Sequence, residues 1–134
     1  MNEFQDEHVP VHLVSSQTVF EGKVFDIQRD ELTLAHSQQP IVREYMGHPG
    51  AVVIVALRGD EGNEEILLER QYRHPVRAKL WEVPAGLLDI PGEDPLIGAQ
   101  RELAEEADLT AQRWDVLLDI FNSPGCSSES IRIF

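Results

Sequence analysis

Cysteine, positive charge and long apolar runs are all scarce in this chain of 134 residues. The single cysteine, Cys126, excludes an intrachain disulfide and a zinc site built from cysteines. The 11 Lys and Arg residues stand against 24 Asp and Glu, and the net charge of −13 argues against nucleic-acid or acidic-membrane partners. No stretch approaches the roughly 18 apolar residues of a membrane span, and the acidic start MNEFQDEHVP has no signal-peptide core. These absences predict a cytoplasmic protein.

The hydrophobic content of 42% is enough for one core. The pattern of apolar and polar residues divides the chain into three parts. Residues 1–13 are polar and predict a loose terminus. Short alternations of apolar and polar residues over 14–45 predict a small antiparallel sheet with a turn at Gly22. Residues 46–134 predict a mixed α/β domain that begins with the continuous apolar run AVVIVAL, typical of a buried strand. Further strands are expected at 65–70, 80–83, 113–121 and 131–134, with Trp81 and Trp114 in the core.

One helix start is well marked. Asp94 is suited to the N-cap position and Pro95 to the first helical position. An apolar stripe with helical spacing follows, formed by Leu96, Ala99, Leu103 and Ala107. We therefore expect a helix that packs on a sheet.

Three carboxylates crowd one face of this expected helix. Glu102, Glu105 and Glu106 stand at i, i+3 and i+4, so their like charges repel one another. A solvated acidic face would be the ordinary interpretation of the helix alone. A hard divalent cation, which prefers oxygen ligands, would compensate the repulsion.

The segment GLLDIPGEDPLIGAQRELAEEADL (86–109) resembles the signature of the Nudix hydrolases, G-x5-E-x7-R-E-U-x-E-E-x-G-U, where U is aliphatic. The positions in register are Glu93, Arg101, Glu102, Leu103, Glu105, Glu106 and Leu109. Two positions depart from the pattern: Gly86 lies one residue further from Glu93, and Asp108 replaces a glycine at the expected helix end. Aspartate adopts left-handed geometry at some cost.

This resemblance implies an α/β (α+β) fold, an α/β/α sandwich around a mixed sheet, preceded by the small N-terminal sheet. The chain stops within an apolar strand pattern, IRIF, so the C-terminal part of such a fold is expected to be absent. The resemblance also implies Mg²⁺ (or Mn²⁺) bound by Glu102, Glu105, Glu106 and the carbonyl of Ala85. Glu93 would be a supporting carboxylate, and Arg101 would orient a glutamate through a charge-assisted bond.

Segments outside the signature are similar to the ADP-ribose pyrophosphatase branch of the family. They are HPGAVVIVAL, ERQYRHPV, LWEVPAGLLD and NSPGCSSE, in which Pro124 follows Leu109 by fifteen residues. The implied reaction is hydrolysis of the ADP-ribose pyrophosphate to AMP and ribose 5-phosphate. Candidate substrate-binding residues are Arg73, as a diphosphate clamp, and Arg43, Pro124 and Glu129. The branch also implies a homodimer formed through the sheet of residues 14–45.

Two alternatives remain open at this point. The substrate could be another nucleoside diphosphate sugar or a dinucleotide. The chain could also be a module that binds ADP-ribose without hydrolysing it, because Asp108 replaces the signature glycine and the general base of this branch is expected beyond Phe134.

Overall fold

The computed structural model describes residues 6–35, 37 and 39–134, which form two compact units. The first unit includes residues up to 48 together with 125–127, and the second comprises 49–124 and 128–134. Residues 1–5 of the expected loose terminus lie outside the described residues, and the first strand begins at Val11. None of the described helices has the length and apolar character needed to cross a membrane.

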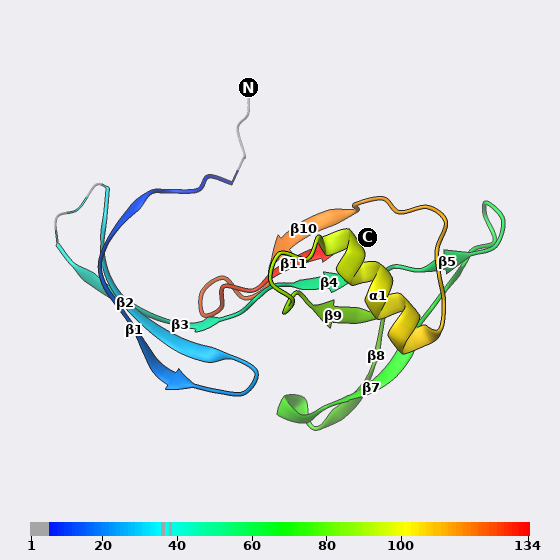
Figure 1. Ribbon diagram of the computed structural model, residues 1–134, viewed down its shortest axis with the longest axis horizontal. Helices are drawn as coiled ribbons and strands as arrows, with labels where there is room; N and C mark the ends of the chain where they lie inside the picture. The colour runs from blue at the N-terminus through cyan, green and yellow to red at the C-terminus, as the bar shows by residue number, and fades with distance from the viewer. Residues whose placement is uncertain (1–5, 36, 38) are drawn as a thin grey trace. The chain divides into compact units, whose positions relative to one another are not determined.

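The first unit is a three-stranded antiparallel sheet, as the alternating pattern predicted (Figure 1). Its strands are β1 (Val11–Glu21), β2 (Asp26–Leu34) and β3 (Ile41–Gly47), in that order. Gly22 begins the β1–β2 turn, where its N–H donates to the Asp26 carboxylate over 3.1 Å. A Cβ at position 22 would overlap the Phe25 carbonyl, so this turn requires glycine.

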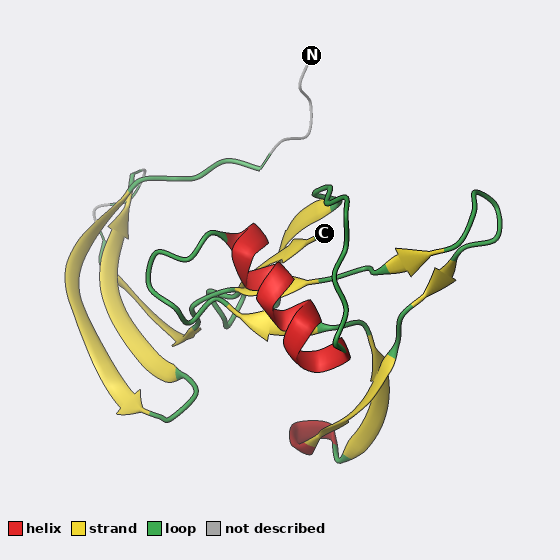
Figure 2. Ribbon diagram, turned by 45° about the vertical axis from the view of Figure 1, so that its right-hand side comes forward, coloured by secondary structure: helices red, strands yellow, loops and turns green. Residues whose placement is uncertain are grey.

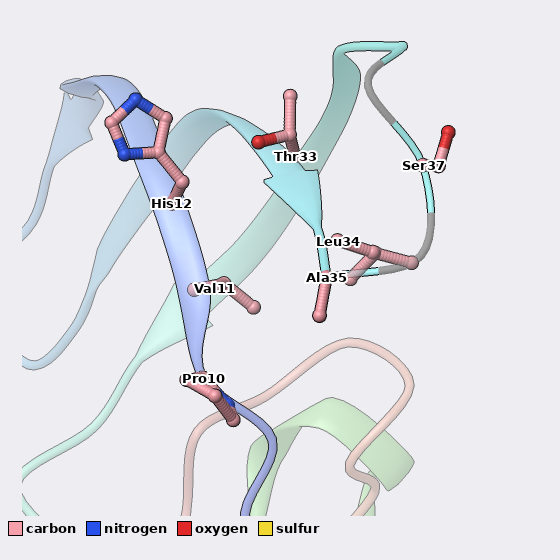
Figure 3. Close-up of a pocket in the computed structure, with 7 residues that line it drawn as sticks. All are labelled: Pro10, Val11, His12, Thr33, Leu34, Ala35 and Ser37. Atoms are coloured by element: carbon pink, nitrogen blue, oxygen red, sulfur yellow. The ribbon is translucent and has the colours of Figure 1, made fainter.

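An open hollow lies at the end of the β1–β2 ribbon in this unit (Figure 3). Its lining consists of Pro10, Val11, His12, Thr33, Leu34, Ala35 and Ser37. His12 is the only titratable side chain among these seven described residues, and none of the seven carries a carboxylate. This described lining therefore lacks the oxygen-rich chemistry expected of a metal site.

The second unit is built on a four-stranded mixed sheet in the order β10-β11-β4-β9. β4 (Ala51–Val53) runs parallel to β11 (Ser130–Ile133), whereas β9 (Ala85–Leu87) and β10 (Leu118–Phe121) pair antiparallel to their neighbours. Two separate hairpins extend the unit: β5 (Leu57–Arg58) with β6 (Glu65–Ile66), and β7 (Glu69–Arg73) with β8 (Ala78–Glu82). A 3₁₀ turn, η1 (His74–Val76), connects β7 to β8. The expected mixed α+β architecture is confirmed.

Helix α1 (Pro95–Ala107) packs across β4 and β9 (Figure 2). Its Asp94 N-cap accepts from the Leu96 N–H over 2.8 Å, and Pro95 occupies the first turn, as predicted. Ala99 and Leu103 are fully buried, with Leu96 and Ala107 packed beside them. The predicted apolar stripe is therefore the face that the helix turns to the sheet, against Val52, Ile54 and Phe134.

Several strand boundaries differ from the sequence prediction. The run AVVIVAL splits into β4 and β5 because Ile54 and Val55 donate to Pro84 and Phe134 outside a regular ladder. The strand expected over 113–121 begins only at Leu118. Trp114 packs edge-on against Phe134 at 5.9 Å between ring centroids, as expected for the core. Trp81 was wrongly placed in the core: it is 67% exposed and lies under the Arg70 guanidinium on the β7–β8 hairpin.

Candidate metal centre

The loop between β9 and α1 and the polar face of α1 bring the signature carboxylates together. Asp94 caps the helix, which then runs without a break from Pro95 to Ala107. Helical spacing then carries Glu102 and Glu106 to the same side, and both lie against residues 85–86 of β9. The glycine loop and the helix therefore build one site within the second unit.

Arg101 is the centre of an ion-pair network. Its Nη1 donates to Glu102 Oε1 over 2.6 Å, while Nη2 and Nε donate to the Glu93 carboxylate over 3.1 and 3.3 Å. The contact with Glu105 is longer, 3.5 Å, and Glu105 is 62% exposed. The two near carboxylates hold the pKa of Arg101 above its ordinary value. Arg101 thus compensates much of the negative charge that the sequence places on this helix.

Glu102 is held close to the backbone of β9. Its side chain is 14% exposed, and a Cβ at position 86 would overlap it. Gly86 is therefore required here for close approach and not for an unusual backbone angle. Although Gly86 lies one residue out of the family spacing, it occupies the position that the carboxylate needs.

Glu106 has a different environment. Its Oε2 accepts from the Ala85 N–H over 3.3 Å, the one hydrogen bond that the described part of the chain gives its carboxylate. Burial against β9 raises the pKa of Glu106, and the nearby Glu69 carboxylate raises it further. Arg73 acts in the opposite direction, so its guanidinium lies within electrostatic reach. Glu106 is thus the helix carboxylate with the least compensation from neighbouring cations.

The donor set suits a hard cation that keeps part of its water shell. Among residues 6–35, 37 and 39–134, no group of three or more His, Cys, Asp or Glu side chains converges closely enough to hold a metal ion. Mg²⁺ in phosphate-ester sites is commonly held by one or two carboxylates, with water and substrate phosphates completing the shell. Glu102 and Glu106 beside the Ala85–Gly86 backbone fit that requirement.

The end of helix α1 shows how the second departure from the signature is accommodated. Asp108 takes the left-handed conformation, φ 54° and ψ 38°, and its N–H donates to the Ala104 carbonyl over 3.0 Å. The aspartate therefore performs the capping that glycine performs in the signature. The helix ends at the expected residue.

The predicted substrate-binding residues are distributed over three elements. Arg73 ends β7 and forms a bidentate ion pair with Glu82 on β8. Pro124 lies in the loop between β10 and β11, whose base is closed by Asn122 Nδ2 donating to Glu129 Oε2 over 2.5 Å. Arg43 belongs to β3 of the first unit, where its Nη1 donates to the Val42 carbonyl over 2.9 Å.

Glu82 and Glu69 were not singled out from the sequence. Glu69 pairs directly with Glu82 across the β7–β8 ladder, and alternation puts both on the face that carries Arg73. The sequence does not link Glu82 to the other two until the register of the hairpin is known, because Glu82 lies nine positions from Arg73 and thirteen from Glu69.

A glycine loop followed by a helix with one arginine and three glutamates defines a Nudix site. The family description "NUDIX domain" matches residues 47–133, and the chain belongs to this family, as the signature predicted. Nudix hydrolases use divalent metal ions.

Named relatives give a finer comparison. The chain is 45% identical over 121 residues to the ADP-ribose pyrophosphatase of Mycobacterium tuberculosis (strain ATCC 25618 / H37Rv), covering 90% of this chain and 56% of that protein. It is 35% identical to the ADP-ribose pyrophosphatase of Bacillus subtilis (strain 168) and 34% identical to the methanol dehydrogenase activator of Bacillus methanolicus. Each of these two matches covers 90% of this chain and 63% of the relative.

A solved structure supports the fold. The structure described as "Crystal structure of ADP compounds hydrolase" superimposes with a TM-score of 0.73 at 24% identity, over 96% of this chain and 68% of that one. The chain spans 56% to 63% of the length of the three curated relatives named above.

Proposed function

We propose that this chain carries out divalent-metal-dependent hydrolysis of the pyrophosphate bond of ADP-ribose, giving AMP and ribose 5-phosphate. The observation that supports this most directly is the pairing of Glu102 and Glu106 against the Ala85–Gly86 backbone, in a chain 45% identical to an ADP-ribose pyrophosphatase. The whole reaction is a proposal for this chain, because it spans only part of its relatives' length.

The metal would be held by Glu102, Glu106 and the Ala85 carbonyl, with Glu105 as a further direct or water-mediated ligand. We propose Mg²⁺ (or Mn²⁺) as the ion, since both accept oxygen ligands. When bound, such an ion neutralises phosphoryl oxygens and lowers the pKa of an attacking water. Arg101 and Glu93 would hold Glu102 in place, while Arg73 would bind the diphosphate through its guanidinium.

The other candidate residues would bind the rest of the substrate. Pro124 and Glu129 frame the β10–β11 loop, which would contact the terminal ribose, and Arg43 would be a further phosphate contact. Substitution of Pro124 or Arg73 by alanine should raise the Michaelis constant for ADP-ribose. An unchanged constant in either variant would remove that residue from the site.

The reaction is tested by product analysis. The protein is incubated with Mg²⁺ or Mn²⁺ and a panel of ADP-ribose, other nucleoside diphosphate sugars and dinucleotides, and the products are separated by chromatography. AMP from ADP-ribose alone supports the proposal, and turnover of another substrate supports the first alternative. Binding of ADP-ribose without product supports a module that binds without hydrolysis.

The metal centre is tested by Glu106→Gln. We expect metal-dependent turnover to be abolished with the fold intact, because the amide keeps the shape of the side chain but loses the charge. Circular dichroism checks the fold, and Glu65→Gln is a matched control on the exposed β5–β6 hairpin. Near-normal activity of Glu106→Gln would show that this helix face is not the metal site.

We also propose a homodimer formed by the first unit. β1 leaves Val11, Leu13 and Phe20 half exposed, at 51%, 50% and 56%, on a sheet of only three strands. Light scattering after gel filtration should give twice the mass of the chain, and Leu13→Glu should shift it to the monomer. A monomeric wild-type protein at all concentrations would contradict this assembly.

A further inference from the structure

The β7–β8 hairpin has two chemically different faces. Strand alternation and the register Glu69–Glu82 and Arg73–Ala78 place Glu69, Arg73 and Glu82 on one face. The opposite face carries Arg70 and Trp81, with the Arg70 guanidinium 5.7 Å from the Trp81 ring centroid. Arg73 is therefore the one arginine of the hairpin that shares a face with the two glutamates.

A bidentate ion pair with Glu82 holds Arg73 on this face. Its Nε lies 3.0 Å from each Glu82 oxygen, and its Nη2 lies 2.6 Å from Oε2. Contact along one edge fixes the plane of a guanidinium as well as its position, which a single hydrogen bond does not do. Glu82, at 20% exposure, is the more buried partner, so it serves as the anchor for the 48% exposed arginine.

The contact with Glu82 leaves part of the guanidinium available. Within the described residues, Nη1 of Arg73 makes no hydrogen bond, and a guanidinium has five N–H groups in all. Glu82 ends β8, only three positions before Ala85 begins β9. The Arg73–Glu82 pair is therefore anchored close along the chain to the backbone of the proposed metal centre.

We propose that Glu82 is a positioning residue that holds Arg73 so that its Nη1 edge can bind the diphosphate of the nucleotide substrate. This inference rests on the proposed function, because it assumes that Arg73 binds the diphosphate. Glu82 itself would touch neither the substrate nor the metal. Its effect would be to reduce the side-chain freedom that Arg73 loses on binding.

Glu82 could in principle also act in the opposite way, so the direction of the change in substrate affinity is what the experiment must determine. A carboxylate that competes with phosphate for Arg73 would weaken substrate binding, so its removal would improve affinity. A carboxylate that positions Arg73 would strengthen binding, so its removal would reduce affinity. The direction of the change in Glu82→Gln separates these two roles.

The experiment is a double-mutant cycle of wild type, Glu82→Gln, Arg73→Ala and the double variant. Calorimetry with metal chelated gives the dissociation constant for ADP-ribose, and AMP production with Mg²⁺ gives kcat and KM. We expect Glu82→Gln to raise both the dissociation constant and KM by about tenfold, or about 1.4 kcal/mol. Its kcat should stay within about threefold of wild type, and the double variant should bind no more weakly than Arg73→Ala.

Glu65→Gln is the matched control, since Glu65 forms a comparable cross-strand ion pair with Arg58 on the other hairpin, at 2.7 Å. It should leave affinity unchanged. Unchanged or tighter binding by Glu82→Gln, or effects that add in the double variant, would overturn the positioning role while leaving the proposed function intact. If Arg73→Ala binds as wild type does, or if wild type does not bind, the inference fails as well. Wild-type turnover is measured separately and alone decides the proposed function.

Discussion

A single methyl group at position 86 provides a sharp test of the site geometry. In Gly86→Ala the new Cβ would overlap the Cγ, Cδ and Oε1 atoms of Glu102. The Cγ atom is not the flexible end of the side chain, so a small rotation of the carboxylate does not relieve the clash. Glu102 must therefore leave its rotamer and its 2.6 Å contact with Arg101.

The expected cost follows from what this movement breaks. A hydrogen bond between charged groups that are mostly shielded from solvent contributes about 1.5–3 kcal/mol, and forcing extra volume into a packed site costs about 1–3 kcal/mol. These two quantities describe the same displacement, so they do not add. We expect the free energy of unfolding to fall by about 2 kcal/mol, which at a urea m-value of about 2 kcal/mol/M lowers the midpoint by about 1 M.

The assay combines urea unfolding with Mg²⁺-dependent AMP production. Turnover of Gly86→Ala should fall at least about tenfold, because a carboxylate proposed to bind the metal is displaced. Gly47→Ala is the matched control: Gly47 lies in β3, and the nearest atom to its added Cβ is Gln28 Cγ at an ordinary 3.5 Å. If Gly86→Ala retains both stability and turnover, Glu102 does not approach β9 this closely and the reasoning is refuted.

Three further substitutions test other parts of the second unit. Asp108→Gly should raise the free energy of unfolding by about 0.5–1 kcal/mol in urea titrations, because glycine adopts the left-handed C-cap without strain. Leu103→Ala should lower it by about 2–5 kcal/mol, since Leu103 is 1% exposed between α1 and the sheet. Arg132 lowers the pKa of Asp119 through two hydrogen bonds of 2.8 Å, so this pair stabilises the fold above the unfolded pKa of about 3.9. That stabilisation is lost as pH falls through the lowered folded value. The stability difference between wild type and Asp119→Asn, measured in unfolding curves at a series of pH values, should therefore shrink as pH falls below about 3.9 and vanish below the lowered folded pKa of Asp119.

The helix was predictable in detail because its signals are local. The Asp94 side chain reaches its own first turn, Pro95 fixes a backbone angle, and the apolar stripe needs only helical periodicity. The left-handed conformation of Asp108 at the helix end was also predictable, since it depends on the backbone of one residue. The family and the mixed fold follow from the same stretch of sequence.

The hairpin of β7 and β8 was less predictable because its contacts depend on register. Arg73 and Glu82 meet only when Glu69 faces Glu82 across the ladder, and nothing within either strand specifies that pairing. Trp81 was mispredicted for the same reason. In a strand that alternates apolar and polar residues, an apolar Trp81 next to Glu82 is expected to face the core. The β7–β8 sheet has only two strands, however, and the face that Trp81 shares with Arg70 is exposed to solvent.

The charges of the helix face indicate which carboxylate a cation would change most. Arg101 contacts Glu102 and Glu105 and ties the first to Glu93, so these carboxylates have a positive partner within the chain. Glu106 has one neutral N–H donor among the described residues, and Glu69 adds to its negative surroundings. A divalent ion at Glu106 would therefore relieve repulsion that Arg101 leaves uncompensated. In the fold, Arg101 pairs with Glu102 and Glu105, and Glu106 is the carboxylate at which the proposed metal ion would add the most compensation.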